Sequence, residues 1–183
     1  MAGRRERIIL ATDLGIAMAE YLDGDEEAVD AASDLEFMQD PDDRPVPFQF
    51  DILRVALIEV PAGRLIGVMW WYPIPYGPTL SRTSWNIGIK LISEARGRRH
   101  GARAARLLVR YLFDTTEVDR VQATTEEANL PGLRGLELAG FRREGILRGI
   151  TIRGGERRDM VLYGLLRSDL EPDDDTDHTP CCG

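Results

Sequence analysis

Apolar residues alternate with polar ones, or form short unbroken runs, in three consecutive segments of the chain. These are ILRVALIEV at residues 52–60, RLIGVMWWY at residues 64–72 and RTSWNIGIKLI at residues 82–92. Their length and their content of β-branched and aromatic residues predict β-strands. The sequence PAG predicts a tight turn after the first strand, and PIPYGP predicts an irregular excursion before the third. We therefore predict an antiparallel meander.

The second half of the chain alternates between helical and strand patterns. Residues 101–113 place Ala104, Leu108 and Leu112 on one apolar stripe, which predicts an amphipathic helix. The same criteria predict, in order, a strand at 119–125, a helix at 130–139 and strands at 142–153 and 156–166 joined by an RGGE turn. A strand, helix and strand in succession favour a right-handed crossover with parallel pairing.

The N-terminal region completes the predicted fold. Residues 6–11 predict a strand, and residues 14–22 and 25–38 predict helices, the second with acidic residues in its first turn. We expect one α/β (α+β) domain over residues 1–170, with a mixed, mostly antiparallel sheet of about seven strands flanked by about four helices.

Composition limits the classes of partner. A chain of 183 residues with 43% hydrophobic and 30% charged residues is expected to bury one core. The formal charge of -8 disfavours nucleic acid and favours cationic or amine-bearing partners. No apolar run has the length of a membrane span or of a secretory signal, so we expect no membrane partner and a cytoplasmic location.

The last thirteen residues are acidic and carry both cysteines, Cys181 and Cys182, beside His178. We expect residues 171–183 to form a disordered tail. Adjacent thiols could bind a metal, but a four-ligand zinc site needs partners that this segment lacks, so we expect no metal site.

A glycine-punctuated basic loop precedes the predicted helix at residues 101–113. Residues 96–101 read RGRRHG, between a strand and a helix N-terminus. Unpaired amides and the positive end of the helix dipole there would bind a phosphate or diphosphate. An ordinary connection that uses glycine for tight turns remains the alternative at this point.

Three separate blocks decide between these readings. They are NIGIKLISEARGRRHGARAARLLVRYLF, RVQATTEEANLPGLRGLELAGFRREGILR and DMVLYGLLRSDL. In this order they resemble the GNAT acyl-CoA-dependent N-acetyltransferases, especially the branch that acetylates the N-termini of ribosomal proteins. The likeness covers roughly residues 50–170. It implies acetyl-CoA or coenzyme A as co-substrate and an amine as acceptor.

The resemblance implies a site for the diphosphate of CoA and for its pantetheine arm. Arg96, Arg99 and Gly101 occupy the fixed positions of the family's loop, although the family has Gly where this chain has Arg99. Arg99 must then adopt a backbone geometry that glycine adopts more readily, or the loop has shifted to use Gly97. Asn129 matches the Asn near the pantetheine and also reads as a helix N-cap. The implied cofactor-binding residues are Leu91, Ile92, Arg96, Gly97, Arg98, Arg99, His100, Gly101, Ala102 and Asn129.

The family's usual proton-transfer groups are missing. Asn86 stands where relatives often have a catalytic Glu, and the positions of the family's Tyr and of the ribosomal branch's Ser read Leu136 and Gly132. An Asn side chain cannot remove a proton. Transfer from a thioester still needs a neutral amine, a donor for the oxyanion and a proton for the thiolate.

Three explanations of this deficit stay open. The protein could act mainly by proximity, with backbone N–H groups near residues 90–92 stabilising the oxyanion. Other side chains could substitute, or the chain could have lost or changed the chemistry. The candidate substitutes are Glu59, Tyr72, Tyr76, Glu94, His100 and Tyr163. Our catalytic candidates are Asn86, Tyr163 and Glu94.

The acceptor pocket is expected near residues 69–82, lined by Trp71, Tyr72 and Tyr76. We predict an acyl-CoA-dependent N-acyltransferase, acting as a monomer or homodimer on a small-molecule or peptide amine. The alternatives are a pathway-specific acyltransferase with a non-acetyl donor or hydroxyl acceptor, and a non-catalytic acyl-CoA-binding domain.

Overall fold

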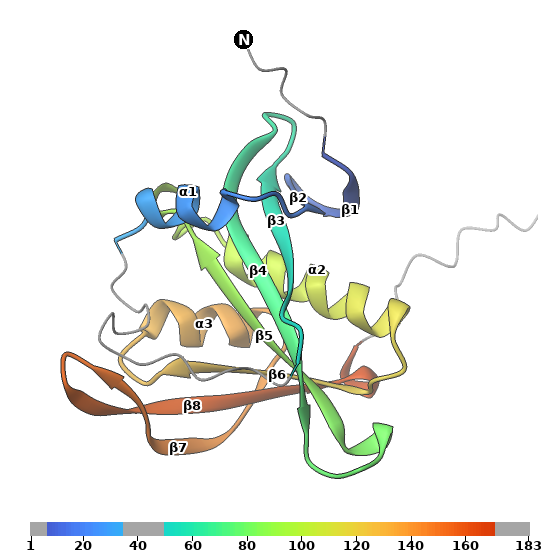
Figure 1. Ribbon diagram of the computed structural model, residues 1–183, viewed down its shortest axis with the longest axis vertical. Helices are drawn as coiled ribbons and strands as arrows, with labels where there is room; N and C mark the ends of the chain where they lie inside the picture. The colour runs from blue at the N-terminus through green and yellow to red at the C-terminus, as the bar shows by residue number, and fades with distance from the viewer. Residues whose placement is uncertain (1–6, 35–49, 171–183) are drawn as a thin grey trace, which may run out of the picture.

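The computed structural model describes residues 7–34 and 50–170. In the described residues the chain forms one eight-stranded sheet and three α-helices, in the order β1-β2-β3-β4-β5-β6-β8-β7 across the sheet (Figure 1). The strands are β1 Ile9–Asp13, β2 Ile16–Glu20, β3 Leu53–Glu59, β4 Arg64–Pro75, β5 Thr83–Leu91, β6 Arg120–Glu126, β7 Arg142–Arg153 and β8 Glu156–Leu166. The helices are α1 Asp25–Ala31, α2 His100–Thr115 and α3 Leu130–Leu138.

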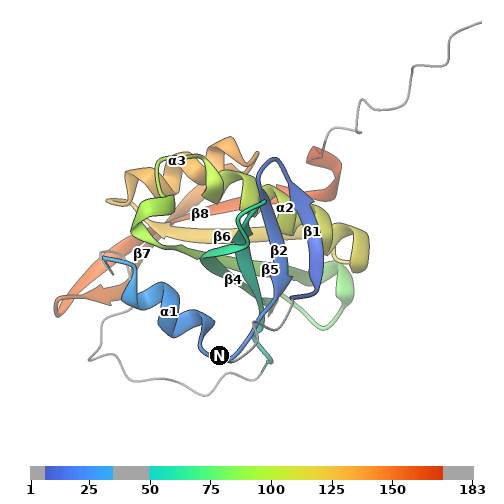
Figure 2. The same ribbon diagram turned by 90° about the horizontal axis from the view of Figure 1, so that it is seen from above.

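All neighbouring strands pair antiparallel except β5 and β6, which are parallel. The β5–α2–β6 crossover makes this pair, as the strand, helix and strand pattern predicted. The predicted fold class is confirmed, and the described residues form one strand more and one helix fewer than expected. Helices α2 and α3 cover one face of the sheet and α1 lies on the other (Figure 2).

The helix predicted at residues 14–22 is wrong. Gly15 adopts a left-handed conformation, with φ of 86°, in a tight turn between β1 and β2. Ile16, Ala17, Met18 and Ala19 are fully buried because β2 lies inside the sheet and is covered on both faces. A short unbroken apolar run of this kind fits a buried strand as well as a buried helix, so periodicity could not separate them.

Other boundaries differ in smaller ways. Helix α1 ends at Ala31, and the rest of the predicted helix from residue 35 onward lies outside the described residues. Strand β4 continues to Pro75, whereas the prediction ended it at residue 72. Beyond Trp71 the strand has no β3 residue beside it, so Pro73 and Pro75 deprive no neighbouring strand of a hydrogen bond. The predicted C-terminal tail with Cys181 and Cys182 also lies outside the described residues.

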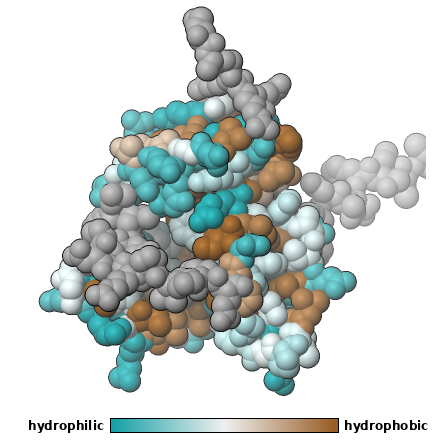
Figure 3. All heavy atoms as spheres, in the orientation of Figure 1, coloured by the Kyte–Doolittle hydropathy of each residue, from teal (hydrophilic) through white to brown (hydrophobic). Residues whose placement is uncertain are grey.

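The core lies between the sheet and α2 with α3. Leu108 and Leu112 of α2 are buried against it, and Trp71 of β4 packs edge to face on Tyr111, with ring centroids 6.3 Å apart. The apolar stripe predicted for this helix therefore faces the sheet. No helix in the described part of the chain has the length and apolar character needed to cross a membrane. On the opposite face, the surface that α1 forms is mainly hydrophilic (Figure 3).

Candidate acyl-CoA site

Strands β5 and β6 form a fork. They pair only through Trp85 with Val121 and Asn86 with Gln122. Beyond that point β5 stays paired with β4 and β6 stays paired with β8, but the two strands have no pairing with each other (Figure 1). The fork opens toward the C-terminal ends of both strands and leaves one backbone edge of β5 without a strand partner.

Strand alternation decides which amides face the fork. The Ile92 N–H donates to the carbonyl of Ile66 in β4, with N and O 3.0 Å apart, so this amide is not open to a ligand. Alternation then turns the N–H groups of Ile87, Ile89 and Leu91 toward the open edge. The sequence analysis expected oxyanion donors near residues 90–92. Of these, the Leu91 N–H points toward the open edge of β5, whereas the Ile92 N–H points toward β4.

A row of polar side chains crosses the sheet where the fork begins. Tyr72 of β4 lies opposite Asn86 of β5, which in turn lies beside Gln122 of β6, so the three side chains share the face that carries α1. Burial raises the pKa of the Tyr72 hydroxyl above its ordinary value. The Tyr76 hydroxyl donates to Oε1 of Gln122 over 2.7 Å. Tyr72 and Asn86 therefore lie side by side, and Tyr76 joins the row through Gln122. The acceptor-binding role predicted for Tyr72 and Tyr76 stays a prediction.

Asn86 is the central residue of this row. It is only 9% exposed, and its carboxamide makes no hydrogen bond with any part of the chain described here. A buried carboxamide without a partner has hydrogen-bonding capacity left for a ligand. Gln122 was missed by sequence reasoning, because nothing in RVQATTE marks a Gln that pairs beside Asn86.

The loop at residues 96–101 follows the short 3-10 helix Ser93–Ala95 after β5 and leads into α2. Gly97 and Arg99 both adopt left-handed backbone conformations, with φ of 72° and 62°. Arg99 thus has the geometry that glycine adopts more readily, and Gly97 has it as well. In the described part of the chain the amides of residues 97–102 donate no hydrogen bond. Six open amides at the N-terminus of a 16-residue helix form a site suited to a diphosphate.

Basic side chains surround this loop. Arg98, Arg99 and Arg103 are exposed or partly exposed, and His100 begins the helix. Burial lowers the pKa of His100 below its ordinary value, with Arg103 and Arg98 adding to the effect and Glu59 opposing it. Its Nδ1 atom is buried and has no hydrogen-bond partner among the described residues. An anion bound at the loop would stabilise the protonated imidazole.

Asn129 opens α3 on the other arm of the fork. Its Oδ1 accepts from the Gly132 N–H over 3.0 Å, and its Nδ2 donates to the Thr125 hydroxyl over 3.0 Å. The N-cap interpretation of Asn129 is therefore correct. A Cβ at Gly132 would lie 2.6 Å from Asn129 Nδ2 and 2.7 Å from Thr125 Oγ1, so a Ser at Gly132 would displace this cap.

Several expected side chains lie away from the row. Trp71 faces α2 on the opposite side of the sheet. Tyr163 is buried on that same side, where its hydroxyl donates to Glu137 of α3 over 3.2 Å, and burial followed by Glu137 raises its pKa. Glu94 is 75% exposed and pairs with Arg64 over 2.7 Å. The structure does not bring Trp71, Tyr163 or Glu94 to Asn86.

A cavity of about 520 Å³ lies at the open end of β6, beside the start of β8. Its lining residues are Glu126, Glu127, Ala128, Arg157, Arg158 and Asp159. Glu126 is buried and its Oε1 accepts from Nε of Arg153 over 2.8 Å. Sequence reasoning missed this buried carboxylate, because an acid at a strand end reads as solvent-exposed until the β7–β8 hairpin covers it.

Known proteins share this architecture. The family model described as an acetyltransferase (GNAT) domain matches residues 16–142. A probable N-acetyltransferase of Bacillus subtilis, YjcK, is 34% identical over 108 residues, which are 59% of this chain and 58% of that protein. The chain spans 46% to 58% of the length of three curated relatives that it matches.

Solved structures show the same fold. A GNAT-family acetyltransferase from Bacillus anthracis superimposes with a TM-score of 0.67 at 19% identity, covering 89% of this chain and 99% of that one. Mycobacterium smegmatis RimJ in complex with CoA-disulfide superimposes with a TM-score of 0.59 at 23% identity, covering 66% of this chain and 56% of that one. Because the family model covers most of the chain, this protein belongs to the GNAT acetyltransferase family.

Proposed function

We propose that this protein transfers an acyl group, acetyl in the simplest case, from coenzyme A to a primary amine. One observation carries the proposal: the open edge of β5 and the open amides of residues 97–102 are joined only by the short segment of residues 92–96. A single long ligand with a diphosphate at one end and a thioester at the other can therefore contact both. The CoA-disulfide bound to M. smegmatis RimJ supports CoA as a ligand of this fold.

Each part of the site has a separate task. The amides of residues 97–102 and the positive end of α2 hold the diphosphate. The open edge of β5 pairs with the amide groups of the pantetheine arm, and the Asn129 side of the fork closes over it. The thioester supplies an acyl carbon that an amine can attack, with loss of the thiolate.

The residues around the fork favour catalysis by position. The Leu91 N–H faces the open edge, where it can donate to the thioester oxygen as negative charge develops there. Asn86 can hydrogen-bond the amine and orient its lone pair, but it cannot take the proton. The amine therefore reacts in its neutral form: its nitrogen bonds the acyl carbon, the carbon–sulfur bond breaks, and the amine proton leaves to water as the thiolate gains one.

The acceptor approaches from the face that carries Tyr72, Asn86 and Gln122. This face bears α1, whose first turn carries Asp25, Glu26 and Glu27. Asp25 pairs with Arg7, and Glu26 pairs with Lys90 and Arg54, so the exposed Glu27 is the acid of this turn that favours a cationic acceptor during approach. The resemblance to the branch acting on ribosomal N-termini makes peptide N-termini acceptors to test beside small-molecule amines.

A thioester-consumption assay beside calorimetry with CoA tests the proposal. The acceptor panel contains pooled small amines, short peptides with free N-termini and hydroxyl compounds, each offered with several acyl-CoA donors. Binding with turnover on an amine is the expected result. Binding without turnover on any acceptor would instead favour a non-catalytic acyl-CoA-binding domain, and absence of both would overturn the assignment.

A further inference from the structure

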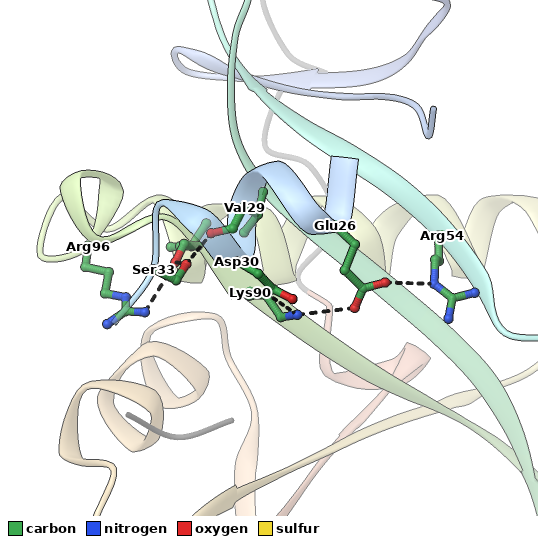
Figure 4. A network of polar contacts seen from close by, with 8 residues as sticks. Glu26, Val29, Asp30, Ser33, Arg54, Lys90 and Arg96 are labelled. Atoms are coloured by element: carbon green, nitrogen blue, oxygen red, sulfur yellow. Dashed lines mark hydrogen bonds and ion pairs between the residues drawn. The ribbon is translucent and has the colours of Figure 1, made fainter. Parts of the chain in front are cut away.

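Arg96, at the first position of the loop, is already engaged by the protein. Its Nη1 lies 2.6 Å from Oδ1 and 2.5 Å from Oδ2 of Asp34, and its Nη2 lies 3.4 Å from the carbonyl oxygen of Leu91. Figure 4 shows the guanidinium beside the segment that follows α1. The family resemblance placed Arg96 among the CoA-binding residues. Its side chain instead points toward Asp34, in the segment that follows α1.

Two more contacts join the same segments. The Ser93 N–H donates to the Ala32 carbonyl over 2.9 Å. The Ser33 hydroxyl lies 2.7 Å from the Val29 carbonyl oxygen and 3.0 Å from that of Leu91. Residues 32–34 are therefore attached at three points to the chain between the tip of β5 and the start of the loop.

The helix before these residues is also fixed to β5. Lys90 has a side chain only 5% exposed, and its Nζ lies 2.7 Å from Oδ1 of Asp30 and 3.2 Å from Oε1 of Glu26 (Figure 4). Glu26 also approaches Arg54 of β3, at 3.6 Å. Ion pairs therefore hold α1 to both β3 and β5, and this fixes the position of Asp34 just after the helix.

The loop needs such a fixed point. The six amides of residues 97–102 donate no hydrogen bond in the described chain, so they do not hold the loop in shape. Arg99 occupies a left-handed conformation that costs a non-glycine residue free energy. Asp34 is the side chain that the structure shows bound to the first residue of this loop.

We propose that Asp34 is a positioning residue for the CoA loop, acting through Arg96. Arg96 serves as a strut between residues 32–34 and the loop and is not itself a ligand of the diphosphate. This inference rests on the proposed function, because the ligand of the loop is taken to be CoA. The strut keeps the loop ordered before binding, which lowers the conformational cost of binding.

Four variants and one matched control test the strut. The CoA dissociation constant is measured by calorimetry, and backbone order parameters of residues 97–99 are measured by nitrogen-15 relaxation without CoA. The variants are Asp34→Asn, Arg96→Gln, the double variant and Asp34→Glu, which keeps the charge. Glu94→Gln is the control. It removes one negative charge from the segment between β5 and α2, but Glu94 pairs with Arg64 and not with Arg96.

The strut has a distinct signature. Asp34→Asn and Arg96→Gln each weaken CoA binding about two- to fivefold, the range for an exposed ion pair. The double variant binds CoA as tightly as the single variant with the lower affinity, because each single substitution already removes the same ion pair. Order parameters at residues 97–99 fall in all three, Asp34→Glu recovers most of the affinity, and Glu94→Gln changes neither quantity. In turnover the KM for acyl-CoA rises while kcat stays constant.

A direct contact between Arg96 and the diphosphate gives the opposite pattern. Asp34→Asn would then free the guanidinium and leave CoA binding unchanged or tighter, while Arg96→Gln alone weakened it; this overturns the strut. Unchanged order parameters in Asp34→Asn overturn it as well. A wild type that fails to bind CoA overturns the proposed function instead, and the order parameters alone then decide the strut.

Lys90 reports whether α1 stays in place during this test. It is the only lysine of the chain, so it is the only side chain that an amine-reactive reagent can label. Peptide mapping of the labelled protein then reports the exposure of Lys90. The strut predicts that Lys90 stays protected in Asp34→Asn, because its own partners are Glu26 and Asp30. Labelling of Lys90 in that variant would show that α1 has detached from β5. It would overturn the proposal that Asp34 acts on the loop through Arg96.

Discussion

The indole of Trp70 fills the space in which a side chain at Gly88 would begin. The two residues lie opposite each other on β4 and β5, and a Cβ at Gly88 would overlap the indole at Cε2, Cζ2 and Nε1. The ring is therefore packed on bare backbone beside the Asn86 row. This close approach explains a glycine within a strand, where it is otherwise unfavourable.

Gly88→Ala is expected to destabilise the protein by about 1–3 kcal/mol, because the Trp70 ring must move to admit the methyl group. The free energy of unfolding from urea titration measures the effect. Gly135→Ala is the matched control, since it lies in α3 with nothing within 4 Å of its Cβ position, and it should raise stability by up to about 1 kcal/mol. Equal stability of Gly88→Ala and wild type would contradict the packing described.

Gly101→Val is expected to weaken CoA binding at least tenfold, as a steric estimate of about 1.4 kcal/mol or more. Outside its own helix backbone and chain neighbours, a Cβ at Gly101 would meet only Leu91 Cδ1, at 3.6 Å, so the fold should tolerate the substitution, but the valine would narrow the approach to the open amides. Calorimetry with CoA gives the affinity and thermal unfolding gives the stability. Retained affinity would place the diphosphate elsewhere.

Asn86→Ala separates a catalytic role from a structural one. The Asn86 carboxamide has no partner in the described chain, so its loss should leave stability within about 0.5 kcal/mol of wild type. If the carboxamide orients the amine, kcat/KM should fall about tenfold, the value of one hydrogen bond. Steady-state kinetics and urea unfolding measure the two effects. A stability loss without a kinetic loss would make Asn86 a structural residue.

CoA binding should take up protons through His100. Burial holds the pKa of free His100 below its ordinary value, and a bound diphosphate would raise it. Affinity should therefore increase as pH falls through the range between the two pKa values, and level off below the lower one. Calorimetry in buffers of different ionisation enthalpy counts the protons. His100→Gln should abolish the uptake; the same uptake in that variant would implicate another group.

Glu144 should contribute stability at neutral pH that is lost in acid. A two-pronged hydrogen bond from Arg120 lowers the pKa of Glu144, against the opposing effect of burial. A depressed folded-state pKa means that stability is present above the unfolded pKa, near about 4, and is lost as pH falls through the folded one. Glu144→Gln should therefore be less stable than wild type at pH 7 and equally stable in acid. Urea midpoints across this range provide the test, and parallel curves would contradict it.

Local pattern was sufficient for most of the fold. The meander, the helix at residues 101–113 and the final hairpin were predicted within a few residues, because each has a period of its own and turns rich in glycine or proline. The basic loop was also visible, since RGRRHG stands between a strand and a helix. The helix predicted at residues 14–22 failed because burial on both faces of β2 removes the alternation that identifies a strand.

The sequence by itself determined the strand and helix order from residue 52 onward, the loop before α2 and the presence of Asn at position 86, where relatives often have Glu. Only the tertiary structure decided which groups share a site: it placed Gln122 beside Asn86, turned Tyr163 and Trp71 to the other face, and paired Arg96 with Asp34. The physical reason is that local sequence fixes backbone period and turn geometry, whereas strand register and the direction of a long side chain depend on partners far along the chain.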